Sequence, residues 1–425
     1  MSNIATIEEQ QTSSKLPKRE GSNGSESSKS ISSEITSHSH SLGRSIGNLL
    51  SNPASWTKKH LHHHSEPASP TAAVPRLNER YGPYIKPVQK GTKSSGSTNK
   101  NNIGSGATAV IRLVQSSGRI LAVKEFIKRG KSEDEREYLK RMHNEYCISK
   151  TVSGHPNVVE TIDLVMDEKD RWCTVMEYCD GGDLFNLLSE RPSMTVAESS
   201  CLFKQMMLGL KHLHGLGIAH RDIKPENMVL TRGGTLKIAD YGVADVVQTC
   251  FEKECHQCHK WCGSEPFWAP EIWSLRNQDD GYDGRALDVW SAAVTYFCIR
   301  FQQLPFVASF YTGKPGSRAP SGSIPGSPAA VASQAEDGGD RDFGKYVKQR
   351  AESESVSCDL WDTFEGLTHE ERVCLAGMLD PNPETRWTAD QVLESSWMTS
   401  VELCKDGELE NGWRHYHSLA RSKSS

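Results

Sequence analysis

Hydrophobic and polar positions divide the chain into three regions. Up to about residue 102, apolar residues are sparse among Ser, Gly, Pro, Asn and His. Such a segment cannot bury enough apolar surface to offset its chain entropy. Alternating, β-rich runs follow at 110–114 and 120–127, and two more strand patterns lie within 158–178. Residues 133–151 have helical spacing, and helical patterns dominate from about residue 183, so we predict an α+β fold in which a small β-rich lobe precedes a larger α-helical lobe.

These regions set the expected domain limits. We expect residues 1–99 to be a disordered Ser-rich regulatory tail, residues 100–400 to form one folded domain, and residues 401–425 to be a C-terminal tail. The stretch at about 311–340 is rich in Gly, Pro, Ser and Ala. It is predicted to be a long loop inserted into the folded domain.

Charge and cysteine usage indicate the compartment. The first 100 residues hold 13 Lys and Arg against 7 Asp and Glu, although the whole chain carries a formal charge of −5. The 12 cysteines are scattered, and no N-terminal apolar run resembles a signal peptide. No apolar stretch reaches the roughly 18 to 20 residues that span a bilayer. We therefore expect a cytoplasmic protein without a transmembrane segment or a nucleic-acid partner, and the basic tail leaves peripheral membrane contact open.

Four motifs then appear in a fixed order. A glycine-rich segment at 104–109 is followed by a strand that ends in Lys124, and the helical stretch at 133–151 carries Glu145. The octet at 220–227 reads His-Arg-Asp-Ile-Lys-Pro-Glu-Asn, and Asp-Tyr-Gly at 240–242 follows a strand-like run. Each motif except the octet is weak evidence for a function when taken alone. Their fixed order makes the combination a specific signal.

The combination resembles the eukaryotic protein kinase family, over about residues 100–400. The resemblance implies the bilobal kinase fold and transfer of the γ-phosphoryl group of ATP to protein Ser and Thr hydroxyls. Lys124 is then the lysine that contacts the ATP phosphates, and Glu145 is the helix glutamate that holds this lysine. Asp222 is expected to orient the substrate hydroxyl and accept its proton. Lys224, two residues later, is typical of serine/threonine-specific members.

The same resemblance implies the ligands of Mg²⁺ and ATP. Asn227 and Asp240 are expected to bind Mg²⁺. The residues expected to contact the nucleotide are Gly104, Ser105, Gly106, Ala107, Ile111, Ala122, Lys124, Glu177, Cys179, Asp183 and Val229. Ile111, Ala122 and Val229 among them offer the apolar surface that an adenine ring needs.

Three further matches to the family pattern lie after the octet, in the predicted helical lobe. Ser264 stands where the serine/threonine group places a hydroxyl that contacts the aspartate and lysine of the octet. Ala269-Pro270-Glu271 closes the activation segment, and Arg386 matches the arginine that pairs with this glutamate. Asp288-Val289-Trp290 resembles the start of the helix that supports the octet from below.

Other segments resemble one branch of the family. The Arg80-Tyr81-Gly82 lead-in, the segment 263–271 and the Leu304-Pro305-Phe306 sequence before the insertion are similar to the fungal halotolerance and nitrogen-permease-reactivator kinases. This resemblance implies protein substrates that include regulators of plasma-membrane transporters, in nutrient or cation homeostasis. Two residues depart from the family pattern: Ala109 replaces the third glycine of the loop, and Ser149 replaces an apolar residue four positions after Glu145.

Three questions stay open at this stage. The cysteines and histidines within 250–262 are compatible with a metal site, a redox-sensitive patch or ordinary loop residues. Arg221 needs an anion from the activation segment, which a phosphate on Thr249 would supply unless the same cysteines and histidines hold the loop themselves. The alternative to an enzyme is a pseudokinase scaffold that binds partners without turnover.

Overall fold

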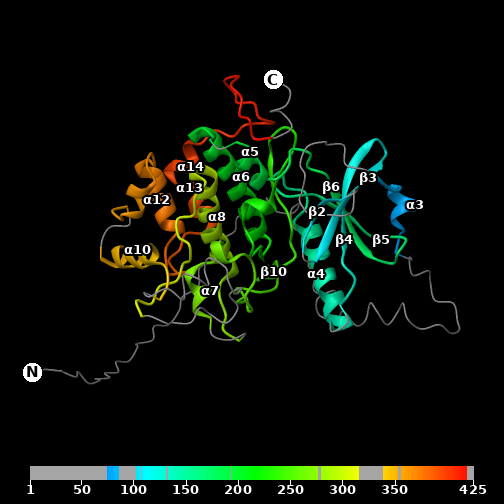
Figure 1. Ribbon diagram of the computed structural model, residues 1–425, viewed down its shortest axis with the longest axis horizontal. Coiled ribbons are helices and arrows are strands. Elements are labelled where there is room, and N and C mark those ends of the chain that lie inside the picture. The colour runs from blue at the N-terminus through cyan, green and yellow to red at the C-terminus, as the bar shows by residue number, and fades with distance from the viewer. Residues whose placement is uncertain are drawn as a thin grey trace, which may run out of the picture.

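The chain folds into two lobes, which a computed structural model describes for residues 74–85, 102–106, 108–130, 133–191, 193–275, 279–314, 338–352 and 356–418. Residues 74–177, the N-lobe, form an antiparallel sheet on one side of the molecule (Figure 1). Residues 178–418, the C-lobe, are mainly helical. The predicted α+β bilobal architecture is confirmed.

The N-lobe sheet has the strand order β1-β3-β4-β6-β5, and β2 pairs with β3 at residues 110–112, next to the part of β3 that pairs with β1. Its strands are β1 (Tyr84–Ile85), β2 (Asn102–Ser105), β3 (Ala109–Ser116), β4 (Arg119–Phe126), β5 (Thr161–Met166) and β6 (Trp172–Glu177). Strands β3 and β4 pair along all eight residues, from Ala109 opposite Phe126 to Ser116 opposite Arg119. The turn between them holds Ser117 at φ 50° and Gly118 at φ 76°. Positive φ at both turn residues matches the twist of the two strands, which fixes their register.

Part of the expected disordered tail is folded, so that prediction is wrong for residues 74–85. Helix α3 (Leu77–Tyr81) buries Leu77 and Tyr81 against the sheet, and β1 adds a strand to its edge. The Tyr81 hydroxyl donates a hydrogen bond of 3.0 Å to Asp163. Two apolar side chains one helical turn apart cover the sheet edge, and the polar composition of the first 100 residues hid this short pattern. The rest of the expected tail, residues 1–73 and 86–99, lies outside the described residues.

Helix α4 (Glu135–Val152) is the helix of the N-lobe that packs beside the sheet (Figure 1). Asp134 caps its first turn, because its carboxylate accepts hydrogen bonds from the amides of Arg136 and Glu137. The face that carries Tyr138, Met142, Glu145 and Ile148 is buried. A glutamate in this apolar stripe requires a cationic partner on the sheet.

The C-lobe is built around two long helices, α6 (Val196–Gly215) and α8 (Gly284–Phe301). Thr195 and Glu198 form a capping box at the start of α6. Almost the whole of α8 is buried, including Trp290, Tyr296 and Phe297. The other helices are α5 (Leu184–Glu190), α7 (Pro270–Ser274), α10 (Arg341–Glu352), α11 (Leu360–Thr363), α12 (His369–Met378), α13 (Ala389–Glu394) and α14 (Ser396–Ser400).

Short strands of the C-lobe form the scaffold of the candidate site. They are β7 (Ile218–Ala219) paired with β10 (Asp245–Val246), and β8 (Met228–Leu230) paired with β9 (Leu236–Ile238). The octet 220–227 lies between β7 and β8, with its last residues in the short 3₁₀ helix η1 (Pro225–Asn227). A second 3₁₀ helix, η2 (Glu265–Phe267), lies in the activation segment. Two antiparallel pairs therefore flank the octet.

The predicted insertion is described only at its ends. Tyr311 bridges to Gly339, and the amide of Asp340 donates to the carbonyl oxygen of Phe310 at 2.8 Å. The segment between them, 315–337, lies outside the described residues. In the part of the chain that is described, no helix is both long enough and apolar enough to cross a membrane.

Candidate active site

The glycine-rich loop joins β2 and β3. Gly104 and Ser105 are in β2, and the amide of Gly106 donates a 2.9 Å hydrogen bond to the carbonyl oxygen of Ala109, which closes the turn. Ala107 lies outside the described residues. Ala109 is the first residue of β3 and pairs with Phe126, so strand geometry at this position needs no glycine. The departure noted in the sequence is therefore accommodated.

Lys124 forms an ionic triad with a buried carboxylate of the N-lobe and a half-exposed carboxylate of the C-lobe. Its Nζ contacts Glu145 of α4 closely and lies 2.7 Å from Oδ1 of Asp240. Burial lowers the pKa of Lys124, but the two carboxylates outweigh this effect and hold the pKa above its ordinary value. The lysine is therefore charged, and the predicted pairing of Lys124 with Glu145 is present in the structure.

The octet is anchored from below by Asp288 of α8. This fully buried carboxylate accepts hydrogen bonds from the amides of His220 at 2.7 Å and Arg221 at 2.6 Å. It also contacts Nε2 of His214 at 3.0 Å. The His220 ring contacts the carbonyl oxygen of Ala239 at 3.0 Å, which ties the octet to the residue before Asp240. The supporting role expected for the start of this helix is confirmed by these contacts.

Asp222 lies at the centre of a polar network. Lys224 Nζ lies 2.8 Å from Asp222 Oδ2 and donates to the Ser264 hydroxyl at 2.7 Å, and that hydroxyl donates to Asp222 Oδ1 at 3.0 Å. The side-chain Nδ2 of Asn227 donates to the carbonyl oxygen of Asp222 at 2.7 Å and to its Oδ2 at 3.0 Å. The structure thus brings these four predicted residues together around one carboxylate.

Asp240 follows β9 in an unusual backbone conformation. Its φ is 64°, a region that non-glycine residues rarely adopt and that often marks functional sites. Lys124 and the amide of Gly242 outweigh burial and lower the pKa of Asp240. Tyr241 next to it is buried, packs against the His220 ring and donates to the carbonyl oxygen of Ile238 at 3.3 Å. Tyrosine therefore fills this position with its hydroxyl satisfied.

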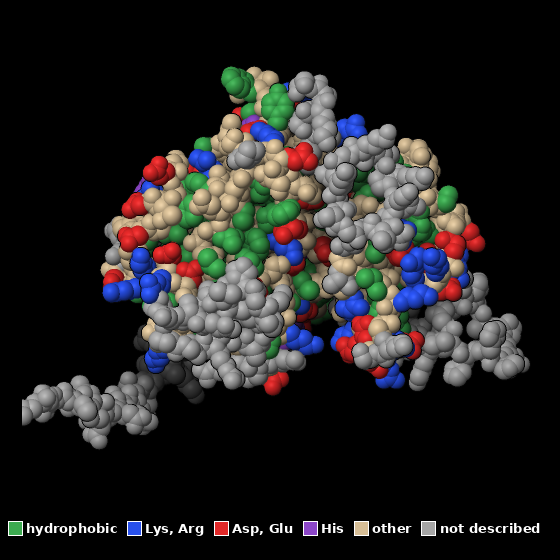
Figure 2. Space-filling view, in the orientation of Figure 1, with side chains coloured by type: hydrophobic (Ala, Val, Ile, Leu, Met, Phe, Trp, Pro, Cys, Tyr) green, Lys and Arg blue, Asp and Glu red, His purple; other side chains and the backbone are tan. Residues whose placement is uncertain are grey.

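The other predicted nucleotide contacts lie on neighbouring strands and at the junction of the lobes. Ala122 of β4 is paired with Met176 of β6, and Ile111 of β3 is paired with Lys124. Glu177 ends β6, two residues before Cys179 at the junction. Asp183 bridges to Val229 of β8 and caps α5 by accepting from the amide of Asn186 at 2.8 Å. Charged side chains of both signs line the boundary between the lobes, with hydrophobic ones beside them on the C-lobe (Figure 2).

Sequence reasoning missed two features of this junction. Lys237 of β9 pairs with the Glu177 carboxylate at 2.8 Å and joins the two lobes. A side chain at Gly181 would meet the carbonyl oxygen of Thr231 at 2.3 Å, so only glycine fits this crossing. Both involve residues that are distant in sequence, and neither belongs to a motif.

The cysteine-rich segment 250–262 belongs to the activation segment. Cys258 is buried, and its backbone exchanges hydrogen bonds with Tyr282 at 2.8 and 3.0 Å. Cys262 Sγ lies 3.4 Å from the Tyr282 hydroxyl, whereas Cys250 is exposed. Among the described residues, no group of three or more metal-ligating side chains includes a cysteine of this segment. The metal alternative considered for it is therefore wrong, because the four thiols do not converge.

Comparison with known proteins gives the family. Residues 97–398 match the family model described as "Protein kinase domain". The chain is 37% identical over 313 residues to the serine/threonine-protein kinase hal4 of Schizosaccharomyces pombe, which covers 72% of this chain and 43% of that protein. It is 34% identical over 316 residues to the serine/threonine-protein kinase HAL4/SAT4 of Saccharomyces cerevisiae, covering 72% of this chain and 46% of that protein.

A third relative is the nitrogen permease reactivator protein of Saccharomyces cerevisiae, 31% identical over 335 residues, or 75% of this chain and 41% of that protein. The chain thus spans less than half the length of these curated relatives. The match covers both lobes and every motif of the site described above. The chain belongs to the protein kinase family, among the fungal serine/threonine-protein kinases related to hal4 and the nitrogen permease reactivator.

Proposed function

We propose that the protein transfers the γ-phosphoryl group of ATP to Ser and Thr hydroxyls of proteins. The observation that supports this most is the assembled network of Asp222, Lys224, Ser264 and Asn227 beside the triad of Lys124, Glu145 and Asp240. Phosphoryl transfer needs positioning and charge neutralisation more than covalent chemistry. These two clusters supply the groups that such a reaction requires.

Asp222 has the role of holding the substrate hydroxyl and accepting its proton. Lys224 neutralises charge on the transferred phosphoryl group, and Ser264 keeps both side chains in place through its two hydrogen bonds. Lys124 is held charged by Glu145 and Asp240 and is ready to contact the phosphates of ATP. The glycine-rich loop is proposed to bind these phosphates through its backbone amides.

Asn227 and Asp240 fit a Mg²⁺ site. Both amide hydrogens of Asn227 face Asp222, which leaves its side-chain oxygen as the ligand atom. Lys124 lowers the pKa of Asp240 and keeps this carboxylate ionised. Carboxylate and amide oxygens are the ligands that Mg²⁺ prefers, and the ion neutralises phosphate charge when bound.

The nucleotide base fits the junction of the lobes. We assign the backbone of Glu177 and Cys179 to the adenine edge, and the side chains of Ile111, Ala122 and Val229 to its faces. Asp183 is assigned to the ribose or to a basic residue of the substrate. The Lys237–Glu177 pair holds the segment that presents these backbone groups.

The substrates are expected to carry basic residues upstream of the phosphorylated hydroxyl. Glu226, the seventh residue of the octet, is exposed, and Asp183 is half-buried at the start of α5. Carboxylates in these positions favour arginine, which forms charge-assisted hydrogen bonds with them. Burial raises the pKa of the Cys298 thiol, and the nearby Glu226 carboxylate raises it further. Because position 298 offers no second carboxylate, the arginine nearest the hydroxyl should matter less.

A peptide-library phosphorylation assay measures this preference. We expect Ser and Thr peptides with upstream arginine to be phosphorylated and Tyr peptides to be ignored. Glu226→Gln should lower kcat/KM for the arginine peptides roughly tenfold relative to alanine peptides, whereas Glu190→Gln, at an exposed carboxylate of α5, should not. A preference for proline or acidic residues in the wild-type enzyme would refute this assignment.

The name of one relative suggests a class of physiological substrate. That relative is named for reactivating a nitrogen permease, and we infer that this protein phosphorylates regulators of plasma-membrane transporters. A phosphoproteome of cells carrying the wild-type protein, compared with cells carrying Lys124→Met, identifies the substrates. If none of the phosphosites that depend on the kinase lay in a transporter regulator, the inference would be contradicted.

We infer that the activation segment requires no phosphate on Thr249, because Arg221 and Thr249 each have other partners. Arg221 donates to the carbonyl oxygen of Val243 at 2.8 Å and to the Tyr282 hydroxyl at 3.2 Å, and it lies 3.4 Å from Asp245. The Thr249 hydroxyl instead donates to Glu252 at 2.8 Å. A phosphate there would add a charge of about −1.5 to −2 beside this carboxylate. These contacts support a loop held without a phosphate, although these partners of Arg221 are not the cysteines and histidines within 250–262.

Two variants separate these alternatives. Thr249→Ala should keep the phosphorylation rate within about twofold, because the Glu252 carboxylate that loses the hydroxyl still accepts from the amide of Thr249 and contacts His256. Tyr282→Phe should lower the rate about tenfold, because it leaves Arg221 and Cys262 without the hydroxyl that joins them. A large loss of activity in Thr249→Ala, together with phosphate on Thr249 in the active wild-type enzyme, would reverse the assignment.

A further inference from the structure

The segment 401–418 after the last helix is packed against the C-lobe. Lys204 of α6 donates to the carbonyl oxygen of Val401 at 2.8 Å, and the amide of Tyr416 donates to Glu198 at 2.9 Å. Arg191 contacts the carbonyl oxygen of Tyr416. In Figure 1 this segment crosses the end of the C-lobe above α5 and α6. These contacts place its histidines beside the start of α6.

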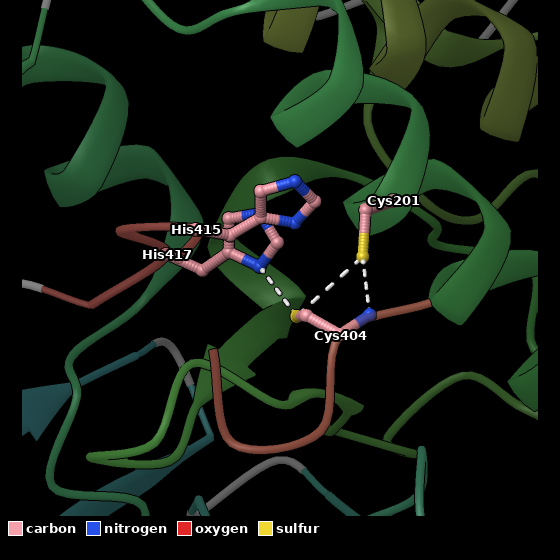
Figure 3. Close-up of side chains that lie close together, drawn as sticks. All are labelled: Cys201, Cys404, His415 and His417. Atoms are coloured by element: carbon pink, nitrogen blue, oxygen red, sulfur yellow. Dashed lines mark hydrogen bonds between the residues drawn. The ribbon is translucent and has the colours of Figure 1, made fainter. Parts of the chain in front are cut away.

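Four metal-ligating side chains converge at this contact. Cys404, His415 and His417 of the segment face Cys201 of α6, as Figure 3 shows. One ligand atom from each residue lies within 4.8 Å of all the others. The two sulfur atoms are 3.6 Å apart, and Cys404 Sγ is 3.7 Å from Nδ1 of His417. Among the described residues, no other group of three or more His, Cys, Asp or Glu side chains brings its ligand atoms this close together.

These separations match a tetrahedral metal site. Zinc–sulfur bonds of about 2.3 Å and zinc–nitrogen bonds of about 2.0–2.1 Å place tetrahedral ligand atoms roughly 3.3–3.8 Å apart. A disulfide requires a sulfur–sulfur distance of about 2.05 Å. The sulfur atoms are therefore at the spacing of two ligands of one ion, and too far apart for a covalent bond.

Hydrogen bonds within the protein do not account for the burial of the cluster. Cys201 is fully buried, and His415 and His417 are 6% and 1% exposed. One nitrogen of each ring, Nδ1 of His415 and Nε2 of His417, is buried without a hydrogen-bond partner in the described part of the chain. The other nitrogen of His417, Nδ1, faces Cys404 and also lies 3.3 Å from the carbonyl oxygen of Gly234. Leaving such a group unsatisfied costs about 1–3 kcal/mol. Burying two neighbouring rings at this free-energy cost needs a further stabilising interaction. A metal ion bound by the ring nitrogens that face the thiols would supply it.

The surroundings stabilise negative charge on sulfur. The amide of Cys404 donates to Cys201 Sγ at 3.4 Å, and the side-chain amide of Gln205 donates to the same sulfur at 3.4 Å. Gln205 is itself fixed, because its oxygen accepts from the amide of Leu236 at 2.8 Å. Donors of this kind orient thiolate ligands around a metal.

We propose that Cys201, Cys404, His415 and His417 bind a structural zinc ion. Two thiolates and two imidazoles in a tetrahedral arrangement favour zinc, and four protein ligands leave no position for a substrate. The ion ties the C-terminal segment to α6 and to the β8–β9 turn, where a side chain at Gly234 would meet His417 Cβ at 2.9 Å. That hairpin connects Asn227 to Asp240, so the site braces the scaffold of the active centre without taking part in the reaction.

Metal analysis of the purified full chain tests the proposal. After removal of any affinity tag and dialysis against a chelator of moderate strength, which strips weak zinc from the histidines of residues 60–64, we expect about one zinc ion per chain. Cys404→Ser and His417→Ala should each lose most of this zinc. Cys298→Ser and His369→Ala, which change a cysteine and a histidine outside the cluster, should retain it.

Two further measurements decide the outcome if a ligand variant fails to fold. A strong zinc chelator should lower the melting temperature of the wild-type chain by several degrees and that of Cys298→Ser equally. The wild-type chain reconstituted with Co²⁺ should show the intense visible absorption of tetrahedral cobalt with thiolate ligands. Zinc no higher than in the Cys404→Ser chain, a six-coordinate cobalt spectrum, or a Cys201–Cys404 disulfide in a non-reducing peptide map would each overturn the proposal.

Discussion

Lys124→Met is expected to lower the rate of phosphoryl transfer at least about 10³-fold while leaving the fold intact. Methionine has a similar length but cannot neutralise phosphate charge. The two carboxylates that lose their cation do not unfold the lobe, because Asp240 is half exposed and burial raises the pKa of Glu145, which can take up a proton. Steady-state kinetics and thermal unfolding of the same preparation measure the two effects.

Lys211→Met is the matched control for this change. Lys211 pairs with Asp390 on the surface of the C-lobe, and its side chain is 49% exposed. Exposed pairs of this kind contribute about 0–1 kcal/mol, so both rate and stability should stay near wild type. Turnover close to normal in Lys124→Met, at an unchanged melting temperature, would show that the triad is not the phosphate-binding group.

Arg386→Ala is expected to destabilise the protein by about 3–5 kcal/mol, the usual cost of breaking a buried ion pair from one side. The guanidinium is fully buried and binds both carboxylate oxygens of Glu271, at 2.7 and 2.9 Å. It also donates to the carbonyl oxygens of Asp380 and Ala286, and it packs over the Trp290 ring. Alanine would leave Glu271 and two carbonyl groups without their partner.

Denaturant unfolding measures this loss, and Arg372→Ala is its control. Arg372 lies 3.6 Å from an exposed carboxylate of Asp362, so removing it should cost less than about 1 kcal/mol. If Arg386→Ala were no more destabilising than Arg372→Ala, the Glu271 pair would not be the contact that holds the end of the activation segment to the C-lobe.

The motifs made the fold and the central contacts predictable. The octet, the Asp-Tyr-Gly sequence and Arg386 each match a family motif that implies the partner of its polar group, so pairings such as Lys124 with Glu145 followed from the resemblance to the family. The strands and helix of the N-lobe were equally clear, because their apolar spacing matches the observed buried faces.

Features built from distant or isolated residues were not predictable. Helix α3 depends on two apolar residues in a polar region, and composition averaged over the region concealed them. Cys201 and Cys404 are 203 residues apart, so no local spacing in the sequence indicates that they lie together. Arg221 contacts the Asp245 carboxylate and the carbonyl oxygen of Val243, and no spacing rule indicates these partners.

The central claim is that this chain is an active serine/threonine kinase and not a scaffold that retains the fold. The most direct measurement is incorporation of the γ-phosphate of radiolabelled Mg²⁺-ATP into a basic Ser/Thr peptide by the purified full chain, beside Asp222→Asn. Asparagine has the size of aspartate and can still contact Lys224 and Ser264. It cannot accept the proton of the substrate hydroxyl. We predict robust incorporation by the wild-type protein and a fall of at least about 10³-fold in the variant. Incorporation by the wild-type protein no higher than by Asp222→Asn, with both proteins folded, would contradict the account.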